Sequence, residues 1–252
     1  MQRSDGGRGK GKLFVVGVGP GHPLDRTRRA EAALRQSEVI AGYTKYIELV
    51  EDLCEGKELI STGMTREVDR CRMALDKVAQ GYVVSLISSG DAGIYGMAGL
   101  ALELAAAEGM DVDIEVAPGV SAANAAGALL GAPLSLDFAT ISLSDLLVPW
   151  EMIKKRLEAV AAADMACALY NPKSRKRVAQ LEAAADIFRR SRPGSTPVGV
   201  CDSIGLDGQS VRISDLDNFQ KEEIGMRTII IIGCSDTKVI NGRMVTPRGY
   251  SL

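Results

Sequence analysis

In this 252-residue chain a strand-like pattern and a helix-like pattern meet at Leu86-Ile87-Ser88-Ser89-Gly90-Asp91-Ala92-Gly93-Ile94-Tyr95-Gly96. The run from Tyr82 to Ile87 is apolar and rich in β-branched residues, which is typical of a buried strand. Strong helix formers follow from Met97 to Glu108, and Gly109 is placed to end that helix. We therefore predict a strand-to-helix turn at the carboxyl end of a strand, where open α/β sheets bind their ligands.

The residues of this turn allow two interpretations. Its glycines let the backbone approach a ligand closely, and its one carboxylate, Asp91, would repel phosphate but would suit a hydroxyl or an ammonium group. The alternative is an ordinary tight turn in which Asp91 caps the following helix. Both interpretations are open on the turn alone.

Composition excludes several classes of protein. A formal net charge of −2 and an aromatic content of 4% disfavour nucleic-acid binding. No apolar run approaches the roughly 20 residues of a membrane-spanning helix. The polar segment 1–12 has no apolar core of a secretory signal, and we interpret it as a disordered leader. The five cysteines are scattered without a CxxC pair, which favours the cytoplasm and indicates no disulfide framework and no protein-bound metal.

Two further turns resemble the first. The strand Leu13–Gly17 leads into Gly17-Val18-Gly19-Pro20-Gly21, where Pro20 and Pro23 delay the next helix until about Thr27. This disfavours a Rossmann NAD site, which needs a helix amino terminus directly at the phosphate. The strand 112–116 leads into Pro118-Gly119-Val120-Ser121-Ala122-Ala123 and a helix of small residues, 122–130. All three turns are predicted ligand-binding loops.

The breaker-rich segment Gly131–Asp137 suggests a domain boundary, which gives an amino-terminal α/β domain at 13–134 and a carboxy-terminal α/β domain at 135–252. The other expected strands are 39–42, 57–60, 138–143, 165–170, 196–201, 209–213 and 228–233. The other expected helices are 46–53, 65–80, 149–162 and 174–190, and a terminal hairpin is expected at 238–245. Polar residues at 142–145 and 170–172 end two of these strands, so we expect strand ends of both α/β lobes to line a cleft between them.

The three turns in this order resemble one family. GxGPG (Gly17 to Gly21), SGDxxxYG (Ser89 to Gly96) and PGVSA (Pro118 to Ala122) are similar to the motifs of the tetrapyrrole methylases, two-domain enzymes that use S-adenosylmethionine. The segments that resemble the precorrin-3B C(17)-methyltransferase and cobalt-factor III methyltransferase branch are 137–151, 170–174, 226–228 and 246–250. Ala92 departs from the proline that many relatives have after the aspartate of this motif.

The resemblance implies a fold, a reaction and a set of residues. It implies two α/β lobes in the tetrapyrrole methylase arrangement, a homodimer, and methyl transfer to ring carbon 17 coupled to ring contraction in cobalamin biosynthesis. The residues that it places at S-adenosylmethionine are Pro20, Ser89, Gly90, Asp91, Ile94, Ser121, Ala122, Asn171 and Thr228, with Asn171 and Thr228 near the adenine.

A tetrapyrrole with many carboxylate arms also needs cations. The candidates are Arg66, Lys173 and Arg248, with Arg26, Arg70 and Arg175 in addition, although each of these residue types taken alone is more often a solvated surface charge. We suspect Asp145 and His22 as acid or base, ahead of Ser144 and Thr27. A loop histidine is ordinarily only solvated, and Asp145 could instead cap the helix after Leu147.

Other functions stay open on the sequence. A relative that methylates diphthamide or ribosomal RNA is disfavoured by the charge balance and by the block Phe138–Trp150. A non-catalytic nucleotide-binding module would use the same glycine-rich turns without a substrate trough. The sequence does not distinguish a tetrapyrrole substrate that contains cobalt from a metal-free one.

Overall fold

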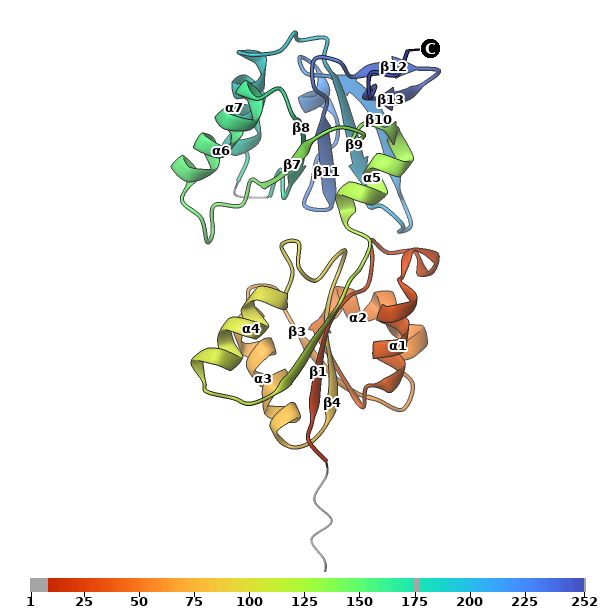
Figure 1. Ribbon diagram of the computed structural model, residues 1–252, viewed down its shortest axis with the longest axis vertical. Helices are drawn as coiled ribbons and strands as arrows, with labels where there is room; N and C mark the ends of the chain where they lie inside the picture. Colours follow the sequence, from red (N-terminus) through yellow and green to blue (C-terminus); the bar gives the residue numbers. More distant parts are fainter. Residues whose placement is uncertain (1–8, 175–176, 252) are drawn as a thin grey trace, which may run out of the picture. The chain divides into compact units, whose positions relative to one another are not determined.

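The computed structural model describes residues 9–174 and 177–251 and divides into two compact units, Met1–Ser121 and Ala122–Leu252 (Figure 1). The division between the units falls after Ser121 and not near residue 134, where the glycine- and proline-containing segment Gly131–Asp137 suggested a domain boundary. The reason is helix α5 (Ala122–Leu130), whose residues Ala126 and Leu130 pack in one core with Ile229 and Ile231 of the second unit's sheet. A helix belongs to the sheet on which it buries its apolar face, so α5 belongs to the second unit.

The first unit contains a parallel five-stranded sheet in the order β3-β2-β4-β1-β5. Its strands are β1 (Lys12–Gly17), β2 (Val39–Tyr43), β3 (Glu58–Thr62), β4 (Val83–Ser88) and β5 (Asp113–Ala117). The middle strands β1, β2 and β4 are almost wholly buried, as their unbroken apolar runs predict for a parallel sheet covered on both faces.

Helices cover both faces of this sheet (Figure 1). On one face lie α1 (Arg28–Gln36), α2 (Thr44–Ile47) and the 3₁₀ helix Glu48–Leu53, over Phe14 and Val16 of β1. On the other lie α3 (Glu67–Ala79) and α4 (Ala98–Ala107), over Leu13 and Val15. The alternation of side chains along β1 therefore supplies both cores.

The elements of the first unit largely agree with the predicted ones, with local differences. The expected helix 46–53 is instead the end of α2 followed by the 3₁₀ helix Glu48–Leu53. A short 3₁₀ helix, Pro23–Asp25, precedes α1, whose cap is Thr27 as predicted. The third helix begins at Glu67 instead of Thr65, a residue with a left-handed φ of 61°. Arg70, which was expected on a solvated face, is 4% exposed. Lys12, the last residue of the expected leader, already belongs to β1, and residues 1–8 of that leader lie outside the described residues.

The second unit contains a mixed sheet in the order β10-β9-β11-β8-β7. Its strands are β7 (Phe138–Ser142), β8 (Ala166–Tyr170), β9 (Pro197–Asp202), β10 (Ser210–Asp215) and β11 (Thr228–Ile232). Strand β11 is central, as predicted, and runs antiparallel to both β8 and β9. The carboxyl ends of β7, β8 and β9 therefore meet the amino ends of β10 and β11 at one edge.

Helices α6 (Trp150–Ala162) and α7 (Ala179–Arg189) cover one face of this sheet and α5 covers the other (Figure 1). The expected hairpin is β12 (Lys238–Ile240) and β13 (Arg243–Val245), and β13 also pairs with β6 (Gly131–Ala132), which the sequence did not predict. A 3₁₀ helix spans Phe219–Lys221. Helix α7 begins at Ala179, so the expected start at Ser174 is wrong. Among the described residues no helix has the length and apolarity to cross a membrane.

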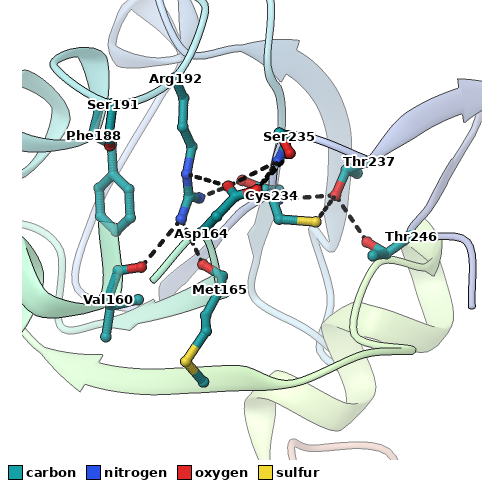
Figure 2. Close-up of polar contacts among 11 residues, drawn as sticks. Val160, Asp164, Met165, Phe188, Ser191, Arg192, Cys234, Ser235, Thr237 and Thr246 are labelled. Atoms are coloured by element: carbon teal, nitrogen blue, oxygen red, sulfur yellow. Dashed lines mark hydrogen bonds and ion pairs between the residues drawn. The ribbon is translucent and has the colours of Figure 1, made fainter. Parts of the chain in front are cut away.

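A buried arginine ties the loops of the second unit together (Figure 2). The Arg192 side chain is fully buried, and its Nε lies 3.2 Å from Oδ1 of Asp164. Its Nη atoms donate to the carbonyl oxygens of Met165 (2.8 Å) and Gly233 (2.5 Å), and its guanidinium lies 4.8 Å from the Phe188 ring centroid. One side chain thus fastens the loop before β8 to the loop after β11.

Candidate ligand-binding site

The three glycine-rich turns of the first unit follow β1, β4 and β5, which are neighbours in the sheet. Gly19 and Gly90 exchange two backbone hydrogen bonds, of 3.0 and 2.7 Å. A Cβ on Gly119 would lie 2.1 Å from the Gly90 carbonyl oxygen and 2.6 Å from that of Gly17. A Cβ on Gly17 would likewise lie 2.7 Å from the Gly90 carbonyl oxygen, so contact between the turns requires glycine at both Gly17 and Gly119.

The location of these turns is one where α/β sheets bind ligands. The helix after β1 covers one face of the sheet and the helix after β4 covers the other. The two strands are adjacent, so their connections separate toward opposite faces at the carboxyl ends of the strands, which is where open α/β sheets bind ligands. This topological switch point is the candidate site of the first unit.

The Asp91 carboxylate joins two of these turns. Its Oδ1 accepts from the backbone N–H of Gly93 at 2.8 Å, and its Oδ2 accepts from that of Gly119 at 2.9 Å. Helix α4 begins only at Ala98 with Met97 as its cap, so the alternative in which Asp91 caps the helix is wrong. Each carboxylate oxygen retains a further lone pair for a ligand hydroxyl or ammonium group.

Several side chains at this site are partly or largely exposed. The Ser89 hydroxyl is half-buried and makes no hydrogen bond within the described chain. Ile94 is 39% exposed and Tyr95 is 53% exposed. Tyr95 has a φ of 55°, which is strained for a residue with a side chain and is a feature that gathers at functional sites. Pro20 is half-buried in the first turn. The turn thus offers a hydroxyl, apolar surface and backbone groups.

Ser121 and Ala122 lie where the two units join along the chain. Ser121 is 4% exposed, and Ala122 is the first residue of α5. The hydroxyl of Thr27 donates to the carbonyl oxygen of Pro118 at 2.8 Å, which attaches the loop before Ser121 to the start of α1. The role of both residues at a cofactor, and the cleft expected between the lobes, stay predictions.

In the second unit the predicted adenine residues lie at one sheet edge. Thr228 is paired with Asp202 in the sheet, and its hydroxyl donates to Oδ1 of Asp202 at 2.6 Å. Continuing the register of β8 and β11 by two residues brings Thr228 opposite Asn171. Asn171 and Ser203 have φ values of 50° and 51° directly after β8 and β9. Strained backbone at the ends of the two strands that flank β11 supports a functional edge here.

The predicted acid and base lie in different units and are both exposed. Nδ1 of His22 accepts from the backbone N–H of Leu24 at 3.2 Å and caps the 3₁₀ helix Pro23–Asp25. Asp145 accepts from Nε2 of Gln180 at 2.8 Å. The following helix is capped by Pro149, so Asp145 is not its cap. A proton-transfer role for either residue remains a prediction.

Ion pairs occupy some of the predicted substrate cations. Arg26 is paired with Asp52 through both carboxylate oxygens at 2.8 Å, and Arg66 is paired with Asp69. Arg70 is buried and donates to Oγ1 of Thr62 at 2.5 Å. These contacts favour a structural role for Arg26 and Arg70, whereas the Arg66 side chain is 62% exposed and its contact with a substrate stays a prediction. The exposed Arg248 guanidinium lies 6.0 Å from the Tyr250 ring centroid, Lys173 is half-buried, and Arg175 lies outside the described residues.

Two residues of the second unit were missed. Arg177 donates from Nη1 to Oγ of Ser144 (3.2 Å) and from Nη2 to the carbonyl oxygen of Asn171 (2.8 Å). Asp202 is the partner of Thr228. Neither residue stands in a recognisable motif. Asp202 directly follows the predicted strand 196–201, whereas Arg177 lay within the expected helix 174–190, so no signal in the sequence pointed to it.

Glycine-rich turns at the switch point of a parallel sheet, with a free hydroxyl and exposed apolar side chains, define an α/β protein that binds a small molecule largely through its backbone. The chain belongs to the tetrapyrrole (corrin/porphyrin) methylases, whose family profile matches residues 12–220.

Curated relatives specify the branch that the motifs suggested. The chain is 45% identical to a probable cobalt-factor III C(17)-methyltransferase of Salmonella typhimurium, over 95% of this chain and 100% of that protein. It is 46% identical to the cobalt-factor III methyltransferase of Priestia megaterium, over 96% of this chain but 45% of that protein. The chain thus spans about half the length of the Priestia relative.

A solved structure shows the same fold. The crystal structure of the methyltransferase CobJ matches with a TM-score of 0.89 and 34% identity, over 94% of this chain and 100% of that one. The expected α/β fold of the tetrapyrrole methylases is confirmed.

Proposed function

We propose that this chain transfers the methyl group of S-adenosylmethionine to ring carbon 17 of cobalt-factor III, in cobalamin biosynthesis, with contraction of the ring. The observation that carries the proposal is the identity of 45% along the whole length of a relative named for that reaction. The three motifs that suggested the family from sequence are the turns that pack together at the switch point.

The residues of the first unit fit S-adenosylmethionine. A ligand with ribose hydroxyls, an ammonium group and no phosphate suits a site whose one carboxylate is Asp91 and whose free hydroxyl is that of Ser89. Ile94 offers apolar contact, and Gly90 brings backbone groups within reach. When bound, this co-substrate supplies an activated methyl group on a sulfonium.

The contribution of the chain to the reaction is mainly orientation. Holding the methyl donor in line with a ring carbon converts a bimolecular step into an intramolecular one, which can supply about 7–11 kcal/mol of the barrier. The rigid packing of the three turns provides such a fixed site. Asp145 and His22 remain the proposed acid and base, and Lys173 and Arg248 remain proposed contacts for the carboxylate arms.

Several finer statements belong to the same proposal. We propose a homodimer that acts in the cytoplasm on a tetrapyrrole substrate, binds neither nucleic acid nor a membrane, and carries no metal of its own. In the described part of the chain no group of three His, Cys, Asp or Glu residues could hold a metal ion. Cobalt would enter as part of the substrate. The oligomeric state of the protein in solution is measured by analytical ultracentrifugation.

Methyl transfer is tested by anaerobic incubation of the protein with S-adenosylmethionine and either cobalt-factor III or metal-free precorrin-3B, followed by mass spectrometry. A product heavier by one methyl group, with the absorption spectrum of a contracted ring, is expected from the cobalt substrate. Turnover of precorrin-3B alone would assign the metal-free reaction. Binding of S-adenosylmethionine without methylation of either ring would refute the proposed substrate, and absence of binding would favour a different small-molecule ligand.

A further inference from the structure

Arg177 differs from the other sheltered arginines of its unit. Arg189, Arg192 and Arg212 are buried or half-buried, and each lies within 4.0 Å of a carboxylate, those of Asp186, Asp164 and Glu222 respectively. Arg177 is also half-buried, yet within the described residues it has no carboxylate partner. A sheltered charge without a counter-ion is costly, so an anion supplied by a ligand would stabilise it.

The contacts of Arg177 leave one N–H group on each Nη nitrogen of its guanidinium without a hydrogen bond among the described residues. Nη1 donates one hydrogen bond to Ser144, Nη2 donates one to the carbonyl oxygen of Asn171, and Nε is shut off from solvent. Each Nη nitrogen carries a second N–H. Two parallel N–H groups at the end of a guanidinium match the two oxygens of a carboxylate.

The guanidinium is also held in a defined place. The Ser174 hydroxyl accepts from the backbone N–H of Arg177 at 3.1 Å, and the backbone N–H of Ser174 donates to its carbonyl oxygen at 2.9 Å. The side-chain amide of Asn171 donates to Oγ of Ser142 at 3.0 Å. Arg177 is thereby fixed to the sheet edge that carries Asn171 and Thr228.

We propose that Arg177 binds a carboxylate brought by a ligand of this edge. The inference rests on the proposed function, because both ligands of that reaction carry carboxylates and neither carries phosphate. The carboxylate has two sources: a side arm of the tetrapyrrole and the amino-acid end of S-adenosylmethionine.

The test measures binding, so it does not depend on turnover. Dissociation constants of S-adenosylmethionine (by calorimetry) and of cobalt-factor III (by absorbance titration) are compared for wild type, Arg177→Met and Arg177→Lys. The matched control is Arg190→Met, which removes an exposed arginine at the end of α7. Circular dichroism and thermal unfolding verify that each variant folds, and Arg177→Gln replaces Arg177→Met if the latter does not fold.

We expect Arg177→Met to weaken one ligand about 10- to 100-fold, the loss of a hydrogen-bonded charge pair. Arg177→Lys should retain part of the affinity, and Arg190→Met should bind as wild type does. Carboxylate-free analogues identify the source. If the effect of the variant disappears with decarboxylated S-adenosylmethionine, the cofactor is the source, and if it disappears with a ring whose arms are amidated, the ring is the source.

Two results would overturn the inference. Equal binding by Arg177→Met and Arg190→Met would show that no carboxylate is held. An effect that persists with both carboxylate-free analogues would show that Arg177 only positions Asn171 and Ser144. A wild-type protein that binds through Arg177 but transfers no methyl group would refute the proposed function alone, whereas one that binds neither ligand would refute both.

Discussion

Oδ2 of Asp91 lies 2.9 Å from the backbone nitrogen of Gly119 and joins the turn after β4 to the turn after β5. The carboxylate thus has a structural role in addition to any contact with a ligand, because its other oxygen accepts a hydrogen bond from the backbone N–H of Gly93. The aspartate of the SGD motif and the glycine of the PGVSA motif therefore depend on each other.

Asp91→Asn should weaken S-adenosylmethionine binding about tenfold or more. An amide has one acceptor oxygen, so its NH₂ group must face one of the two backbone N–H donors, and a hydrogen bond to a charged group contributes about 1.5–3 kcal/mol. Calorimetry measures the loss. The control is Asp111→Asn, which removes only an exposed ion pair with Lys10. Equal affinity of Asp91→Asn and wild type would contradict this account.

Gly119→Ala should abolish cofactor binding and lower the melting temperature, because its Cβ would overlap the Gly90 carbonyl oxygen. Gly99→Ala is the opposite case. Gly99 is exposed in α4 with nothing within 4 Å of its added Cβ, and alanine should stabilise the helix by up to about 1 kcal/mol. Thermal unfolding of both variants measures the contrast, and similar melting temperatures would refute it.

Arg192→Met should destabilise the second unit by about 3 kcal/mol, because it leaves the carbonyl oxygens of Met165 and Gly233 without a donor. Asp164→Asn should lower the free energy of unfolding by less than Arg192→Met does, since the Asp164 carboxylate is 45% exposed. Chemical denaturation measures both. Arg190→Met is the exposed control, and a loss no larger than the control's would show that the network is dispensable.

The ion pair of Arg26 and Asp52 predicts a pH dependence. The guanidinium lowers the pKa of Asp52 below its ordinary value of 3.8. The contribution of this ion pair to the free energy of unfolding is therefore complete above pH 3.8 and is lost as the pH falls through the lowered pKa. Because the Asp52 side chain is 57% exposed, the stabilisation by this ion pair amounts to about 1 kcal/mol or less. Unfolding of wild type and Asp52→Asn should differ at pH 7 and converge at acid pH, and a constant difference would argue against the pair.

The cysteines should react slowly in the native protein. Burial raises the pKa of Cys167 and of Cys201 to about 12 and that of Cys71 to about 11, so almost no thiolate is present at pH 8. Cys234 is 5% exposed, and Cys54 is half-buried. Iodoacetamide followed by mass spectrometry should label mainly Cys54 before denaturation and all five cysteines afterwards. Rapid labelling of Cys167 or Cys201 would show that the core opens readily.

The local signals in the sequence were sufficient where a single element decides the outcome. Thr27 caps α1, the apolar run from Thr228 forms a central strand, and Asn241-Gly242 turns the terminal hairpin, as predicted. The strand-to-helix turn at Ser89–Gly96 could be predicted as well, because its glycines lie within one short segment between a strand and a helix. The start of α7 was wrong: Val178 has a φ of −123° and a ψ of −40°, outside helical geometry, and the helix begins only at Ala179.

The sequence by itself determined the class of fold, the order of the elements and the family, because periodicity, caps and motifs are short-range properties of the chain. Only the tertiary structure decided which distant residues are partners: Asp91 with Gly119, Arg177 with Asn171, and α5 with the sheet of the second unit. These pairings depend on which strands become neighbours and on which face each helix is buried. Strand order is set by the packing of the whole sheet, and no local pattern specifies it.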